Sequence, residues 1–166
     1  MKKVLVVGGA GYVGGITCDL LIKAGYGVTV FDNLLYEDRF LKDIDFVSGD
    51  IRDTEKIASL QKDYDSIMWL AAIVGDGACS QDIELTQEIN YSSLKRFLEK
   101  TKREIIFPST CSVYGASDDL LDEQSSTNPL SAYARTKLMA EEEVLLHGGS
   151  VLRLGTLYGL GDNFSR

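Results

Sequence analysis

A tyrosine and a lysine, Tyr133 and Lys137, stand four positions apart. On an α-helix this spacing places both side chains on one face. A free tyrosine has a pKa of about 10, but a nearby ammonium and the positive ring of an oxidised nicotinamide both favour the phenolate. Tyr133 could then remove a proton from an alcohol while a hydride leaves the neighbouring carbon. A Tyr–Lys pair alone is also typical of a solvated helix, so it needs support from other residues.

Three hydroxyl side chains follow a short apolar run. The run Glu104–Phe107 is closed by Pro108, and Ser109, Thr110 and Ser112 come next. In open α/β sheets, ligands bind at the carboxyl ends of the strands. Each of the three hydroxyls is therefore able to hydrogen-bond the substrate oxygen that the tyrosine would deprotonate.

A glycine-rich segment follows the first apolar run, Val4–Val7. Its spacing is Gly8-x-x-Gly11-x-x-Gly14, and a helical pattern follows. Such glycines allow a tight turn, a close backbone approach to a pyrophosphate and close packing of helix on strand. The helix N-terminus supplies N–H groups and a positive dipole end to the phosphates. The residues expected to bind the cofactor here are Gly8, Gly11, Tyr12, Val13 and Gly14.

An acidic residue, Asp32, ends the second apolar run, 18 positions after Gly14. A carboxylate there can accept hydrogen bonds from both ribose hydroxyls of NAD and would repel the 2′-phosphate of NADP. The sequence therefore favours NAD. The pair Asp50-Ile51, at the end of the third run, could place a carboxylate at the adenine amino group, and a role for Asp50 in the turn is equally open.

Apolar runs alternate with helical patterns along the chain, which is typical of βαβ units and a parallel sheet buried on both faces. We expect a doubly wound, Rossmann-type α/β domain, with polar loops at residues 33–45 and 115–130. The expected strands are Val4–Val7, Gly27–Phe31, Phe46–Val47, Ser66–Ala72, Glu104–Phe107 and Val151–Leu154. The expected helices are Tyr12–Ala24, Thr54–Leu60 (capped by Thr54), Glu84–Lys100 and Ser131–Leu146.

The composition excludes several classes of partner. The 166 residues carry a net charge of −8, which argues against nucleic acid and against an anionic membrane surface. No apolar run has the length of a membrane span. Three unevenly spaced cysteines and one histidine, His147, predict a reduced, cytoplasmic protein without a metal site. Cys111 is expected to have a packing role in the interior, with an approach to the nicotinamide as the alternative. His147 is expected to lie at a helix end.

The chain resembles the extended short-chain dehydrogenase/reductase family, which includes the nucleotide-sugar epimerases and dehydratases. Matching segments occur in family order from residue 1 to about residue 163. They are the Gly8–Gly14 loop, Asp32-Asn33-Leu34, Gly49–Asp53, Leu70-Ala71-Ala72, Asn90, Ser109–Gly115, Tyr133–Lys137 and Leu152–Gly161.

The resemblance implies a role for each matching position. Tyr133 corresponds to the acid/base, and Lys137 to the residue that tunes it and holds the nicotinamide ribose. Thr110, three positions before the Val of Val-Tyr-Gly, corresponds to the family's catalytic Ser/Thr. The other cofactor-binding residues that the resemblance adds are Asn33, Leu70, Ala71, Ala72 and Asn90.

Two departures narrow the expected activity. Dehydratases usually have Thr-Asp-Glu where this chain has Thr110-Cys111-Ser112, which favours an epimerase-like cycle of transient oxidation. Thr156 stands where many nucleotide-sugar members have Asn, which weakens the case for a nucleotide-linked sugar as substrate. The resemblance still favours an NAD-dependent nucleotide-sugar epimerase, with a nucleotide-linked sugar as the expected substrate. A net oxidoreductase or dehydratase of the same family, and a non-catalytic NAD-binding module, remain alternatives.

Family members normally continue into a second region that covers the substrate. We therefore expect residues 1–166 to be an NAD-binding Rossmann domain without its substrate-binding domain, and a fragment rather than a naturally short protein. Such a fragment would be weakly active or inactive. The resemblance also implies a homodimer formed through helices 84–100 and 131–146.

Overall fold

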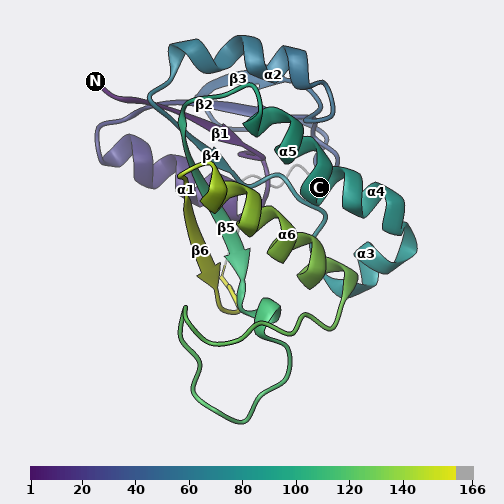
Figure 1. Ribbon diagram of the computed structural model, residues 1–166. Helices are drawn as coiled ribbons and strands as arrows, with labels where there is room; N and C mark the ends of the chain where they lie inside the picture. The colour runs from purple at the N-terminus through teal and green to yellow at the C-terminus, as the bar shows by residue number, and fades with distance from the viewer. Residues whose placement is uncertain (160–166) are drawn as a thin grey trace.

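A six-stranded parallel sheet forms the centre of the protein, in the order β3-β2-β1-β4-β5-β6 (Figure 1). The computed structural model describes residues 1–159. The strands are β1 (Lys3–Val7), β2 (Gly27–Asp32), β3 (Asp45–Ser48), β4 (Ser66–Trp69), β5 (Glu104–Thr110) and β6 (Ser150–Leu154). The expected doubly wound fold is confirmed, and the chain changes winding direction between β1 and β4, where such folds bind their ligands.

Helices cover the two faces of the sheet unequally. Successive strand residues point to opposite faces, so Leu5 and Val7 of β1 join one core cluster while Val4 and Val6 join another. The larger cluster is completed by α2 (Thr54–Leu60), α5 (Ser93–Leu98) and α6 (Ala132–Leu146). The smaller cluster packs under α1 (Tyr12–Lys23). Figure 1 shows α1 apart from α2, α5 and α6.

The expected helix 84–100 is not one regular helix. It consists of α4 (Ile83–Gln87), a π-helical turn at Glu88–Ser92 and α5. A short helix that the sequence analysis did not predict, α3 (Asp76–Gln81), precedes it. π-helical turns occur often at functional sites, and this one carries Asn90.

Two strand boundaries differ from expectation. β4 ends at Trp69 because the next two amides, of Leu70 and Ala71, both turn back to the Val7 carbonyl. β5 runs through Pro108 to Thr110. The β4–β5 pairing stops at Met68 and Ile106, so beyond that point Pro108 has a strand neighbour on one side only, where a missing N–H is tolerated.

Helix ends follow the expected chemistry with one exception. The Ser131 side chain accepts a hydrogen bond from the amide of Ala134 and caps α6, and His147 lies at the other end of that helix. Thr54 does not cap α2. Instead Asp53 accepts from the Lys56 amide at 3.1 Å, because the short Asp side chain reaches that position from one residue earlier.

Among the described residues, 33–44 and 115–130 contain no helix or strand, so the first loop ends one residue earlier than expected, where β3 begins at Asp45. A 3-10 turn, η3 (Cys111–Tyr114), precedes the second loop. In Figure 1 the second loop is the green segment that extends away from the sheet.

Candidate active site

The glycine loop and the segment after β4 lie against each other at the carboxyl edge of the sheet. Gly8 has a φ of +84°, and a Cβ there would lie 2.4 Å from the amide nitrogen of Ala71. Only glycine allows both this backbone conformation and this approach. Gly14 is equally constrained, since a Cβ there would lie 2.6 Å from the Gly8 carbonyl oxygen.

Helix α1 starts directly from this loop. Gly11, which has no side chain, precedes the helix, and Tyr12 and Val13 form its first turn. The first amides of a helix lack intrahelical partners and point outward, where they suit a phosphate group. A glycine cradle that any Cβ would fill, at the start of a helix and beside the sheet's switch point, therefore fits a dinucleotide pyrophosphate.

Asp32 ends β2 beside the glycine loop. Its carboxylate accepts hydrogen bonds from the Ala10 amide at 3.1 Å and from the Leu34 amide at 2.8 Å. Burial raises the pKa of Asp32, while these backbone donors lower it. Leu34 has a φ of +57°, an unfavourable conformation for this residue type. The strained turn keeps the carboxylate at the carboxyl edge, where a ribose would lie.

Asp50 is already engaged within the protein. Arg52 binds its carboxylate with two side-chain nitrogens, at 2.7 and 3.0 Å, and lowers its pKa to about 2. The side-chain amide of Asn33 donates to the same carboxylate at 3.4 Å. These bonds support the turn role of Asp50. The Ile51 side chain is buried in the larger core cluster, so only its backbone faces the edge of the sheet.

Asn90 ties the segment after β4 to the helices behind it. Its side-chain oxygen accepts from the Ile73 amide at 2.8 Å, and its nitrogen donates to the Ile73 carbonyl at 2.9 Å. The same nitrogen lies 3.4 Å from the Thr136 hydroxyl of α6. Asn90 is buried and fixes the backbone at Ile73, which directly follows Leu70–Ala72.

Thr110 and Tyr133 come together where β5 ends and α6 begins. Burial raises the pKa of the Tyr133 phenol, while hydrogen bonding with Thr110 lowers it. The Thr110 hydroxyl also accepts from the Ser112 amide and donates to the Ser112 hydroxyl, both at 3.1 Å. The Ser109 hydroxyl is buried and has no partner among the described residues. Thr110 is thus the expected hydroxyl that influences the pKa of the phenol.

Lys137 lies one helical turn after Tyr133, and its side chain is directed onto β5. Lys137 is 4% exposed, and its Nζ lies 3.9 Å from the centre of the Phe107 ring. Burial lowers the pKa of Lys137 to about 7. The face of an aromatic ring at this distance attracts an ammonium.

The sequence analysis missed a buried ion pair behind these residues. Glu141 is 1% exposed, and its carboxylate accepts from Arg153 of β6 at 2.8, 3.0 and 3.2 Å. The Arg153 guanidinium also lies over the Tyr114 ring at 4.8 Å. Tyr133, Lys137 and Glu141 follow each other at four-residue spacing, so an acid on the buried face of the expected helix was the available signal.

Cys111 does not pack in the interior as expected. Among the three cysteines, Cys18 and Cys79 are buried and Cys111 is exposed, because η3 turns it outward just beyond Thr110.

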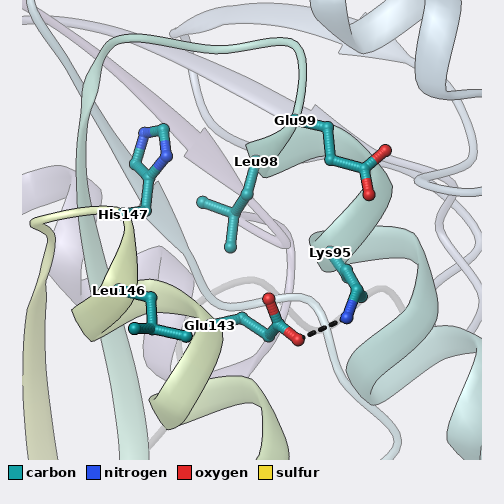
Figure 2. A pocket seen from close by; sticks show the side chains of 6 residues that line it. All are labelled: Lys95, Leu98, Glu99, Glu143, Leu146 and His147. Atoms are coloured by element: carbon teal, nitrogen blue, oxygen red, sulfur yellow. Dashed lines mark hydrogen bonds and ion pairs between the residues drawn. The ribbon is translucent and has the colours of Figure 1, made fainter.

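A shallow groove lies on the outer surface between α5 and α6 (Figure 2). Figure 2 shows Lys95 and Glu143 meeting across it, with a 2.6 Å ion pair. Its other lining residues are Leu98, Glu99, Leu146 and His147. Within residues 1–159, no helix combines the length and apolar character needed to cross a membrane.

Comparison with known proteins identifies the family. The profile of the NAD-dependent epimerase/dehydratase family matches residues 4–166. The chain belongs to this family. This is the family of epimerases and dehydratases that the sequence motifs resemble. Its dependence on NAD agrees with the cofactor predicted from Asp32.

Relatives in this family show what similar chains do. A UDP-glucose 4-epimerase of Rhizobium meliloti is 32% identical over 155 residues, which are 89% of this chain and 47% of that protein. A UDP-N-acetyl-alpha-D-glucosaminuronate decarboxylase of Bacillus cytotoxicus is 32% identical over 123 residues, 69% of this chain and 38% of that protein. The chain therefore spans about half or less of the length of these curated relatives.

A solved structure confirms the fold. The crystal structure of UDP-glucose 4-epimerase from Brucella ovis in complex with NAD superposes with a TM-score of 0.80 at 30% identity. The match covers 93% of this chain and 51% of that one.

Proposed function

We propose that this chain is the NAD-binding Rossmann domain of a nucleotide-sugar 4-epimerase, and that a substrate-binding domain lies outside residues 1–166. The observation that carries the proposal is the packing of α6, which carries Tyr133 and Lys137, on β5, which ends at Thr110. The epimerases among the relatives support it, as does the glycine cradle at the same edge of the sheet.

The residues of the site have distinct tasks in this proposal. The cradle Gly8–Gly14 binds the pyrophosphate, and Asp32 accepts hydrogen bonds from the ribose hydroxyls. The bound nicotinamide supplies the chemistry of hydride acceptance and return. Tyr133 takes the proton of the sugar 4-hydroxyl and later returns it, while Thr110 holds the same oxygen. Lys137 supplies positive charge beside the phenol, which lowers the pKa of Tyr133.

Removal of the phenolic hydroxyl tests the catalytic assignment. In the longest natural form of the protein, Tyr133→Phe should lower kcat by about 10²–10⁴-fold. Tyr64→Phe, on a tyrosine packed against the core elsewhere, is the control and should leave kcat unchanged. Unchanged activity in Tyr133→Phe would overturn the assignment.

Two further measurements separate the alternatives. An epimerase returns the cofactor unchanged, so turnover of a UDP-hexose should give no net NADH, whereas a net oxidoreductase accumulates it. Calorimetric titration of the 166-residue chain with NAD and with NADP should give saturable binding that prefers NAD. Absence of binding to either would contradict the cofactor assignment of the cradle for this chain alone.

The homodimer predicted through helices 84–100 and 131–146 remains a proposal for the surface in Figure 2. Leu146 is 85% exposed at the end of α6, beside the groove. A pair of such surfaces would bury this apolar side chain. Analytical ultracentrifugation of the chain and of Leu146→Glu tests it: the variant should shift a dimer to a monomer, and a monomeric parent chain would refute it.

A further inference from the structure

The ammonium of Lys137 has an aromatic partner on the neighbouring strand. Its Nζ lies 3.9 Å from the centre of the Phe107 ring, well within the distance at which a ring face attracts a cation. Both residues are buried, Lys137 at 4% exposure and Phe107 at 1%. No hydrogen bond to Nζ is formed among residues 1–159.

The charged groups near Lys137 make contacts with other residues. Glu141, one turn further along α6, is the acid that acts on Lys137. Its carboxylate is bound by Arg153 of β6, which offsets its charge. Asp76 and Cys79 of α3 act on the Tyr133 phenol.

Glu143, a second ion-paired acid of α6, does not interact with Lys137. It pairs with Lys95 of α5 on the outer surface, in the groove of Figure 2. The ring face is therefore the direct contact that the described residues offer to the Lys137 ammonium.

We propose that Phe107 is a positioning residue whose ring face holds Lys137 against β5 in its charged form. The same strand carries Thr110 three residues later, so β5 positions both the hydroxyl and the cation of the site. The ring face stabilises the charged ammonium but hardly affects the neutral amine. The stabilisation is large in this buried position, because without the ring the charge would be buried with no compensating partner. The consequence for Tyr133 rests on the proposed function, but the effect on Lys137 itself does not.

Nuclear magnetic resonance of the 166-residue chain with ¹³C-labelled lysine tests the proposal directly. The signal of the Lys137 ε-carbon is assigned by its loss in Lys137→Arg, and its chemical shift is followed against pH. Two changes weaken the ring face: Phe107→Leu, and replacement of Phe107 by trifluorophenylalanine, which keeps the shape of the ring but removes most of its negative face. Each should move the titration midpoint about one pH unit lower, a roughly tenfold loss of proton affinity.

A matched control separates the ring effect from loss of packing. Phe97 is equally buried in the same core cluster and packs against Trp69. Phe97→Leu should lower the free energy of unfolding about as much as Phe107→Leu while leaving the Lys137 midpoint in place. The trifluorophenylalanine form covers the case in which Phe107→Leu fails to fold.

The outcomes are distinct. An unchanged midpoint in the trifluorophenylalanine form overturns the inference, and so does an equal shift in Phe97→Leu. If Tyr133→Phe remains fully active while the Phe107 variants shift Lys137, the proposed catalytic function fails and the role of Phe107 stands.

Discussion

The two parts of the site are built from different materials. The cofactor cradle, from β1 to the start of α1, depends on backbone geometry, on the positive φ of Gly8 and on close approaches that exclude a Cβ. The region around β5 and α6 depends on buried side chains, namely Lys137 on Phe107 and Glu141 on Arg153. The cradle should therefore be sensitive to added volume, and the catalytic region to removed charge or removed aromatic surface.

The largest expected effect comes from added volume in the cradle. Gly8→Ala combines an unfavourable φ with a backbone clash at Ala71, and should lower the free energy of unfolding by about 4 kcal/mol. Gly25 has a nearly identical φ, +86°, but nothing lies within 4 Å of a Cβ there. Gly25→Ala should therefore cost about 1 kcal/mol. Equal losses in urea denaturation would show that φ, and not the close approach, determines the cradle.

Removal of a charge tests the catalytic region. Arg153→Met leaves the buried Glu141 carboxylate without its partner and should lower the free energy of unfolding by about 3 kcal/mol. Glu143, two positions further along α6, pairs with Lys95 in a solvent-exposed position. Glu143→Gln should change stability little, because exposed pairs contribute little. If both changes cost the same, burial is not what makes the catalytic region sensitive.

A smaller effect is expected on the preference for NAD over NADP. It depends on the side chain of Asp32, which lies beside the glycine cradle. Asp32→Ser removes a charged acceptor and should weaken NAD binding by about 10–100-fold, with a smaller loss for NADP. Asp65→Asn is the matched control, since this carboxylate binds the Lys3 amide near the opposite edge of the sheet. Calorimetry of the three proteins checks the prediction, and an unchanged NAD affinity in Asp32→Ser contradicts it.

The smallest expected effect is a pH dependence next to the cradle. Arg52 lowers the pKa of Asp50 from 3.8 to about 2 in the folded protein. The stability from this pair is therefore fully present above about pH 4 and is lost as the pH falls toward 2. Asp50→Asn should slightly reduce the loss of stability between pH 5 and pH 2.5 in denaturation experiments. Because this pair is partly exposed to solvent, a large change would indicate a contact beyond Arg52.

The two parts also differ in how far the sequence predicts them. The glycine spacing and Asp32 lie close together along the chain, so local patterns indicated the cradle. The Tyr133–Lys137 spacing and the helix that carries it were equally local, and α6 is confirmed. The strand order follows from the alternation of elements, because parallel strands with helical crossovers permit few arrangements.

The remaining features depend on contacts between distant segments. Phe107 and Lys137 are 30 positions apart, and nothing in either local pattern predicts that they meet. The π-helical turn places Asn90 where its side chain bonds to the backbone of Ile73. The hydrophobic periodicity of the sequence cannot reveal such a contact. The apolar residues after Trp69 continue the pattern of β4 although the pairing has ended, so the strand was predicted too long.

The uneven exposure of the three cysteines has a practical consequence. Cys18 and Cys79 are sealed in the interior, so a maleimide dye should attach at Cys111 alone. That thiol directly follows Thr110 at the end of β5, and an environment-sensitive fluorophore placed there would report the arrival of a ligand by its emission. The native chain thus carries its own attachment point for an optical sensor of site occupancy.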